Sequence, residues 1–439
     1  MTTSTRSDAS HTLRRSLTLT AVVALGINGV IGQGIFLLPG KAAARMGPAS
    51  VLALLTGAVL CLLIALCFAE VGSRFRGTGG AYLYAKEAFG DFIGFEVGWM
   101  TCCVAVIAWA ALSVGFTKVL GHFIPAIASG LPQKITAVTL MFSLAGVNIL
   151  GAKQGAAVST FFSIAKLVPL AGFVLIGVTA IEPTYFRPFA PNGITTPFAE
   201  TTLLLLYPFV GFETLVVPAG EMADPKRSVP RALLIVMAIA SLIYTAVLLV
   251  SIGTLEGIAG HENPVAAAAE AVMGPVGGTI VAAGIVVSVF GINAGAALVS
   301  PRRFYALCER GDLPRGLARV SPRTGAPVAA ILTTTVLASI LAFSGSFAEL
   351  AKLSVLARFM QYIPTCLAVL VLRRRGHHDG FRLPFGPVLP VIAVALCIWL
   401  MANANPQKLL YGVYALVIGA MFFGLSRLSQ KRSLSDTQS

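Results

Sequence analysis

Long apolar stretches separated by short polar segments run through almost the whole chain. A helix needs about 20 apolar residues to cross the hydrocarbon core of a bilayer. Applied to this sequence, that length predicts an all-α integral membrane protein with twelve transmembrane helices. The expected spans are 17–40, 48–73, 91–121, 134–151, 156–181, 198–222, 231–255, 276–307, 326–344, 348–372, 387–403 and 408–426.

The composition supports a membrane location. Of the 439 residues, 56% are hydrophobic and only 11% are charged, and the mean hydropathy is +0.84. A soluble domain typically has about 25% charged residues, so the composition disfavours a large soluble protein with a very apolar core. The seven cysteines form no C-x-x-C pair, and the chain contains neither a G-x-S-x-G nor a P-loop motif. We therefore expect no enzyme, no cofactor, no metal site and no ATP-driven pump.

The net charge of +14 reports the topology rather than a nucleic-acid partner, because the basic residues gather in short loops. On the predicted topology, 23 of the 32 Lys and Arg residues lie on the side of the N-terminus and seven on the opposite side. The other two, Lys166 and Arg358, lie inside spans. The positive-inside rule then places both termini in the cytoplasm of a multi-pass plasma-membrane protein. Residues 1–16 and 427–439 are expected to be cytoplasmic tails, and no nucleic acid is expected to bind.

Four glycines crowd the middle of the first expected span: Gly26, Gly29, Gly32 and Gly34. Each weakens a helix by about 1 kcal/mol relative to alanine, so local unwinding is easy here. Unwound backbone at membrane depth must line a cavity or lie inside the protein. Close packing of two helices is the alternative interpretation, because small residues at this spacing also suit helix contacts.

The sixth span contains a second interruption. Pro208 lacks a backbone N–H, Gly211 loosens the same turn, and the acidic Glu213 follows. An interruption five spans after the first is the pattern of an inverted repeat of five plus five helices. The predicted organisation is a ten-helix transport core over 17–372, with repeats at about 17–181 and 198–372, followed by helices eleven and twelve over 387–426.

Two broken helices together provide a site for a zwitterion. The N-terminus of a half-helix presents free N–H groups and a positive partial charge, which suit a carboxylate. The C-terminus of a half-helix presents free carbonyls, which suit an ammonium group. An α-amino acid carries both groups, so the pattern predicts transport of amino acids or related amines.

Five segments in consistent order carry a family resemblance: 32–36 (G-Q-G-I-F), 77–82 (G-T-G-G-A-Y), 211–213 (G-F-E), 220–231 (G-E-M-A-D-P-K-R-S-V-P-R) and 300–314, which contains S-P-R-R-F-Y-A and G-D-L-P. They resemble motifs of the amino acid–polyamine–organocation (APC) superfamily of transporters and amino acid permeases. The resemblance implies a LeuT-like fold with broken helices 1 and 6. Two positions depart from the family pattern. Gln33 replaces a small residue, often serine, and Ala296 replaces a bulky aromatic residue found in some members.

The resemblance also implies roles for single residues. The backbone around Gly32 to Gly34 would hold the substrate carboxylate, and carbonyls on the two half-helices would hold its amino group. Aromatic residues of the sixth span would line or gate the pocket. The expected substrate-binding residues are Ile27, Val30, Gly32, Gln33, Gly34, Tyr207, Phe209, Val210 and Phe212.

Charged residues inside spans are candidates for coupling. A lysine at the centre of a helix, such as Lys166, costs about 2.5–3.5 kcal/mol on insertion scales, which favours a partner or a function over snorkelling. Similar transporters without sodium dependence carry a lysine here, which implies that Lys166 replaces a sodium ion and can release a proton. Glu213 either titrates during transport or accepts hydrogen bonds from the unwound backbone. Arg358, near an outer end of the tenth span, is expected to snorkel.

These observations predict a secondary active transporter. The first hypothesis is proton-coupled symport of an amino acid or amine, with Lys166 and Glu213 as coupling residues. Exchange of one amino acid or amine for another is the alternative, and a channel or membrane sensor is a distant one. The expected partners are the small-molecule substrate, a proton and the lipid bilayer. The sequence indicates neither an oligomeric state nor the side chain of the substrate.

Overall fold

The computed structural model describes residues 18–435 except 76–79, 151–154, 223, 310–311, 322, 325 and 377–379. Parts of the motifs at 77–82, 220–231 and 300–314 therefore lie outside the described residues, as do both expected tails except 427–435. The α-helices are α1 (Leu19–Val30), α2 (Gly34–Met46), α3 (Ser50–Gly72), α4 (Ala81–Phe89), α5 (Asp91–Leu120), α6 (Gly130–Leu150), α7 (Gly155–Gly177), α8 (Thr195–Leu206), α9 (Pro225–Thr254), α10 (Pro264–Glu309), α11 (Val328–Ser344), α12 (Phe347–Arg374), α13 (Val388–Ala402) and α14 (Pro406–Ser435). Short 3₁₀ helices are η1 (Gly47–Ala49), η2 (Pro125–Ile127), η3 (Val178–Ala180), η4 (Pro183–Phe186), η5 (Tyr207–Phe209), η6 (Phe212–Glu221), η7 (Ile258–Gly260) and η8 (Arg315–Ala318).

Within the described residues, eight helical segments are long and apolar enough to cross a membrane, and three shorter apolar helices accompany them. The first of the eight, Val22–Gly72, combines α1, α2 and α3. At least one helix lies over each expected span. This confirms the all-helical, membrane-type architecture, whereas the count of twelve crossings stays a prediction.

Local sequence explains several helix boundaries. Helix α9 begins at Pro225, where a missing N–H leaves no helical hydrogen bond unmade. Helix α12 begins after Ser346, whose hydroxyl accepts a hydrogen bond from the N–H of Glu349 at 3.4 Å. Gly90 separates α4 from α5 with a φ of +90°, a conformation that favours glycine. Helix α10 starts earlier than the expected span because it continues across a kink at Gly274, where φ is +71°.

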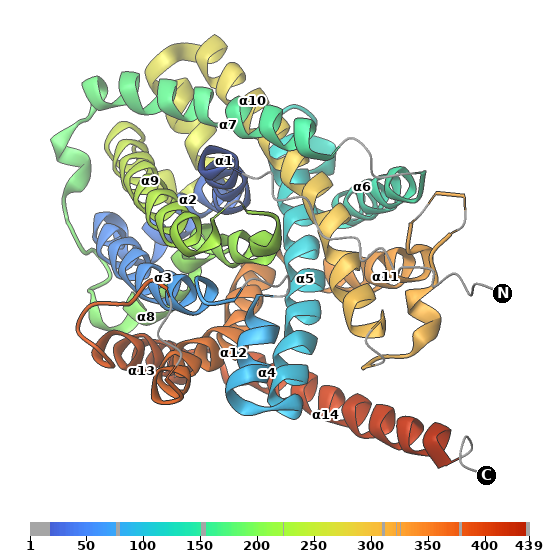
Figure 1. Ribbon diagram of the computed structural model, residues 1–439. Coiled ribbons are helices and arrows are strands. Elements are labelled where there is room, and N and C mark those ends of the chain that lie inside the picture. The colour runs from blue at the N-terminus through green and yellow to red at the C-terminus, as the bar shows by residue number, and fades with distance from the viewer. Residues whose placement is uncertain are drawn as a thin grey trace.

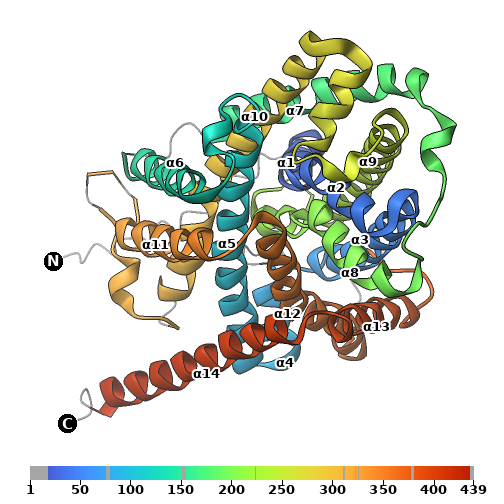
Figure 2. The ribbon, with the colours of Figure 1, turned by 180° about the vertical axis from the view of Figure 1, so that it is seen from behind.

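Helix α5 runs through the middle of the molecule (Figure 1), and α10 and α12 pack along it. Helices α6, α11 and α14 also contact α5. On the other side, α3 packs against α8 and α9, while α1 packs against α7 and α9. Helix α14 extends away from the bundle, as the view from behind also shows (Figure 2). The broken helix formed by α1 and α2 therefore lies among other helices instead of at an edge.

Charged side chains pair at both ends of α3. At its C-terminal end, Glu70 is fully buried and accepts hydrogen bonds from Arg74, from Nε of Arg373 at 2.7 Å and from the N–H of Leu383 at 2.9 Å. Near its N-terminal end, Glu200 of α8 pairs with Arg45 at 2.5 Å and with Lys352 of α12. These ion pairs join helices that are distant in sequence at each end of the bundle.

Candidate functional site at two helix breaks

The first break separates α1 from α2. Helix α1 ends at Val30, residues 31–33 are not helical, and α2 begins at Gly34. The carbonyl oxygen of Gln33 accepts from the N–H groups of Phe36 at 3.1 Å and Leu37 at 3.2 Å, which starts the first turn of α2. The side chain of Gln33, the N-cap residue, makes no capping hydrogen bond. The expected unwinding at the glycines is therefore present, and no N-cap side chain occupies the N–H groups that open α2.

The second break separates α8 from η6. Helix α8 ends at Leu206, and Pro208 lies in the single turn of η5. Val210 is extended, with a ψ of 152°, and Gly211 has a φ of +115°. A residue with a side chain rarely adopts such a φ, so the sequence needs glycine at this point. Pro208 and Gly211 thus interrupt the sixth expected span where their chemistry predicts.

The two breaks lie in direct contact. A Cβ atom added at Gly211 would lie 2.4 Å from the carbonyl oxygen of Gly29. A Cβ atom added at Gly34 would lie 2.9 Å from the side chains of both Tyr207 and Pro208. These approaches are shorter than any Cβ atom tolerates, so the glycines serve close contact as well as unwinding. Both interpretations of the glycines therefore hold, because the segment unwinds and also packs against the other break.

Tyr244 of α9 links the breaks, and its hydroxyl is fully buried. The hydroxyl oxygen lies 2.8 Å from the carbonyl oxygen of Val30 and 2.9 Å from that of Pro208. A hydroxyl has one hydrogen, so it donates to one of these carbonyls at a time. The Tyr244 side chain thus provides a hydrogen-bond donor to backbone carbonyls of both interrupted helices.

Lys166 of α7 lies at the first break and is fully buried. Its Nζ donates to the carbonyl oxygen of Asn28 at 3.0 Å, to Oδ1 of Asn28 at 2.7 Å and to the carbonyl oxygen of Ile31 at 2.9 Å. An ammonium group has three hydrogens, and each finds an oxygen here. Lys166 therefore has partners and does not snorkel.

Arg358 of α12 corrects one expectation. It does not snorkel at a helix end but lies buried near the middle of α12, with its Nε 2.8 Å from Oε1 of Glu213. Oε2 of Glu213 accepts from the N–H of Gly211 at 2.9 Å and from the hydroxyl of Tyr362 at 2.9 Å. Arg358 also contacts Ser354, one turn earlier. Desolvation disfavours a lone buried charge, and Glu213 supplies an opposite charge in place of the hydration that an interface would provide.

Gln33 turns its side chain toward α5 and is fully buried. Its Nε2 donates to the carbonyl oxygen of Ala111 at 2.7 Å. A Cβ atom added at Gly115, one turn further along α5, would lie 2.4 Å from Oε1 of Gln33. A side chain longer than serine therefore fits at position 33, because α5 presents only the small residues Ala111 and Gly115 there.

The aromatic residues expected to line the site fall into two groups. Tyr207 makes an edge contact with Phe347, with ring centroids 5.6 Å apart, and touches Gly34. Phe209 packs against Tyr244 at 4.9 Å, and Phe212 stacks on Tyr362 at 5.4 Å. Phe209 and Phe212 are fully buried, so they hold the second break against its neighbours.

The backbone carbonyls expected to bind the substrate lie near the breaks, and some of them already accept hydrogen bonds within the protein. The carbonyl of Ile27 accepts from the N–H of Ile31 at 2.9 Å, which extends α1 by one hydrogen bond. The carbonyl of Tyr207 accepts from the N–H of Val210 at 3.4 Å. Gly32 faces Ile292 of α10, whose Cδ1 would lie 3.7 Å from an added Cβ. The structure therefore brings the residues of both breaks together around one point.

Sequence reasoning missed Tyr244, Asn28 and Tyr362. Each is a polar residue within an apolar span, as Lys166 is. Their partners lie between 138 and 214 residues away in the chain, except for the 36 residues between Tyr244 and Pro208. The polar residues were therefore visible in the sequence, whereas their pairing was not.

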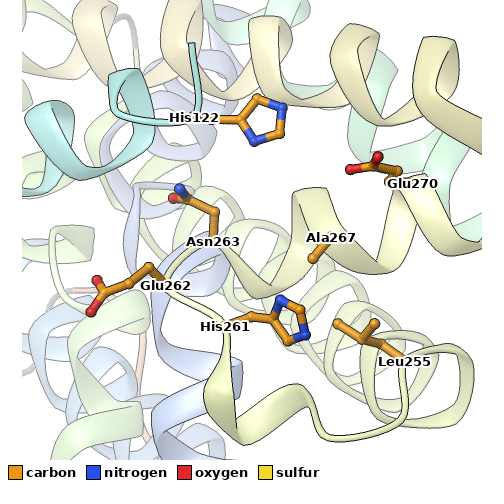
Figure 3. A pocket seen from close by; sticks show the side chains of 7 residues that line it. All are labelled: His122, Leu255, His261, Glu262, Asn263, Ala267 and Glu270. Atoms are coloured by element: carbon orange, nitrogen blue, oxygen red, sulfur yellow. The ribbon is translucent and has the colours of Figure 1, made fainter. Parts of the chain in front are cut away.

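A surface pocket of about 410 Å³ lies away from the breaks (Figure 3). Its polar lining comes from His122, His261, Glu262, Asn263 and Glu270. The polar lining residues come from the end of α5, the loop after η7 and the first turns of α10 (Figure 3). This pocket contains no residue of either break, so we do not assign it to the candidate site.

The molecule is a bundle of apolar helices with two interruptions that contact each other, and a buried basic side chain, Lys166 or Arg358, lies near each. These features define a multi-pass membrane protein with a polar centre. The chain belongs to the amino acid permease family, whose model matches residues 17–425. This confirms the family membership that the motifs predict.

Three relatives show how far the similarity extends. The serine/threonine exchanger SteT of Bacillus subtilis is 32% identical, over 87% of this chain and 89% of SteT. The methylthioribose transporter of the same organism is 27% identical, over 97% of this chain and 95% of the relative. The branched-chain amino acid permease BcaP of Lactococcus lactis is 26% identical, over 97% of both chains. The similarity therefore covers both helix breaks.

Proposed function

We propose that this protein is a secondary active transporter that moves amino acids or related amines across the plasma membrane by proton-coupled symport. The observation that carries the proposal is the buried Lys166 ammonium, which donates to three oxygens at the first break. Loss of a proton would leave two hydrogens for three acceptors, so the protonation of Lys166 and the geometry of the break are linked. Membership of the amino acid permease family supports the substrate class.

The proposal includes twelve membrane crossings and a LeuT-like inverted repeat, with the core over 17–372, repeats at about 17–181 and 198–372, and α13 and α14 outside them. The positions of the two buried cations support this arrangement. Lys166 lies on α7, the last helix of the first proposed repeat, and reaches the break in its first helix. Arg358 lies on α12, the last helix of the second, and reaches the break in α8 through Glu213. The basic loops support cytoplasmic termini.

In the proposed site, the substrate carboxylate lies against the N–H groups around Gly32, Gln33 and Gly34. Its ammonium faces carbonyls near Ile27, Val30, Tyr207 and Val210, while Phe209 and Phe212 keep the second break in place. The uncapped start of α2 supports the first contact, because the positive end of a helix favours an anion. Lys166 is the proposed proton-exchanging residue, and Glu213 takes part in coupling by holding the N–H of Gly211.

Exchange of one amino acid or amine for another is the second candidate function. It is favoured by the similarity to SteT, whose name describes a serine/threonine exchanger. Lys166 is compatible with both modes, because a permanently protonated ammonium would serve an exchanger. A channel or a membrane sensor would not require a site of two half-helices.

Transport by the purified protein in proteoliposomes tests the proposal. Symport predicts saturable, stereoselective amino acid uptake that a pH gradient drives into vesicles without internal substrate. Uptake that occurs only when amino acid is present inside would show obligatory exchange instead. Uptake without saturation would show a channel. In Lys166→Ala, proton-driven uptake should be lost, and persistence of that uptake at the wild-type level would refute the coupling role.

A further inference from the structure

The carboxamide of Gln33 offers two N–H hydrogens and an acceptor oxygen, but it makes a single hydrogen bond to the described residues. Its Nε2 donates to the carbonyl oxygen of Ala111 at 2.7 Å. That acceptor fixes the orientation of the amide, because only the nitrogen side of a carboxamide donates. Oε1 lies, like Nε2, against Gly115 of α5, and no donor among the described residues reaches it. A fully buried acceptor without a donor is uncommon in native proteins and requires an explanation.

Gly115 of α5 lies beside this oxygen, and a polar pair joins α5 to α10 near the first break. Gly115 presents no side chain, and a Cβ atom there would lie 2.4 Å from Oε1. Next to Ile292, which faces Gly32, Asn293 of α10 accepts a hydrogen bond from the Ser113 hydroxyl at 2.9 Å. The amide of Asn293 donates to backbone carbonyls, so that pair has no donor left for Gln33. Among the described residues none donates to Oε1, although the side chain of Tyr207 also lies beside the Gln33 carboxamide. A ligand beside the first break could supply the missing hydrogen.

We propose that Oε1 of Gln33 recognises the substrate side chain by accepting a hydrogen bond from its hydroxyl or amide group. This inference rests on the proposed function, in which the N–H groups of α2 hold the substrate carboxylate and carbonyls hold its ammonium. A side-chain carboxylate does not fit, because it has no hydrogen to donate. The substrate class is therefore neutral amino acids with a hydrogen-bond donor in the side chain, preferred over apolar amino acids of the same shape.

Pairs of amino acids that differ only in the donor test this inference. L-threonine and L-valine have nearly the same shape, as do L-serine and L-alanine. Inhibition of labelled L-threonine uptake into proteoliposomes, and thermal shift of the purified protein, give the affinity for each. The wild-type protein should bind threonine at least about tenfold more tightly than valine, because a site that hydrogen-bonds a hydroxyl rejects analogues without one. Equal affinities would overturn the inference and leave amino acid transport intact.

Two variants remove the interaction from opposite sides. Gln33→Met keeps the length of the side chain without its oxygen. Gly115→Ala places a methyl group within 2.4 Å of Oε1 and 2.5 Å of Nε2, so it displaces the whole carboxamide. Both should reduce the threonine-to-valine ratio to within about twofold of one, whereas general destabilisation would weaken both ligands alike. A wild-type ratio in either variant would overturn the inference.

Matched controls use the same exchanges elsewhere. Gln407→Met changes an exposed glutamine on α14, and Gly146→Ala changes a glycine on α6 with nothing within 4 Å of an added Cβ. Both should keep the wild-type ratio. If Gln33→Met does not fold, the wild-type ratio and Gly115→Ala decide the question. Failure of every amino acid to bind the folded wild-type protein would overturn the proposed function itself, which separates the two results.

Discussion

The ion pair between Arg358 and Glu213 makes a quantitative prediction. Their side chains are only 8% and 6% exposed, so solvent screens neither charge. Arg358→Gln removes the positive partner and leaves Glu213 with hydrogen bonds from Gly211 and Tyr362 alone. The loss of one member of a buried pair costs about 3–5 kcal/mol, because the remaining charge stays desolvated. We expect Arg358→Gln to lower the free energy of unfolding by this amount.

The double variant Glu213→Gln/Arg358→Gln removes both charges and should recover much of that loss. Neutral groups in place of a buried ion pair often cost little. The two substitutions should therefore be non-additive, with a coupling energy of about 2–3 kcal/mol. Titration of the purified variants with SDS in mixed micelles, followed by tryptophan fluorescence, measures each free energy of unfolding.

The control for this cycle is Arg427→Gln, which breaks an exposed pair with Asp91. A surface pair contributes about 0–1 kcal/mol, so the control should unfold close to the wild type. Additive effects of Glu213→Gln and Arg358→Gln would refute the reasoning, because they would show that neither charge depends on the other.

Three further predictions follow from the breaks and from one surface pair. In Gly211→Ala, the φ of +115° and the 2.4 Å approach to Gly29 should reduce the free energy of unfolding by at least about 1–3 kcal/mol in the same SDS titration. Tyr244→Phe leaves two buried carbonyls without their shared donor and should cost about 1–3 kcal/mol, and an unchanged titration would contradict the link between the breaks. Burial raises the pKa of Glu262, but the hydrogen bond and charge of Lys118 outweigh it and hold that pKa below its usual range. The stability from this pair, about 0.2–1 kcal/mol, is present above the unfolded pKa of about 4.3 and is lost as the pH falls through the lower folded value. A pH series of unfolding should show this acid loss in the wild type but not in Glu262→Gln.

The sequence indicates the breaks because their causes are local. Glycines around Gly32 weaken the helix, and Pro208 removes a donor, so both interruptions occur where composition predicts them. The all-helical membrane architecture is readable for the same reason, since a run of apolar residues identifies a membrane helix without knowledge of its neighbours.

The contacts between breaks are not local and could not be predicted. The position of Arg358 near an outer end of the tenth expected span predicts snorkelling, but its partner Glu213 lies 145 residues earlier in the chain. The orientation of Gln33 likewise depends on Ala111 and Gly115, which read as ordinary small residues of an apolar helix. Periodicity and composition describe one helix at a time, whereas the candidate site is a property of several helices together.

The hydroxyl of Tyr244 has fewer hydrogens than there are carbonyl groups facing it. One hydrogen faces two carbonyl oxygens, those of Val30 and Pro208, so the Tyr244 hydroxyl satisfies only one of them at a time. A primary ammonium group at this junction would bring three hydrogens. Hydrogen bonds to the carbonyl that Tyr244 does not serve would then offset part of the cost of its desolvation.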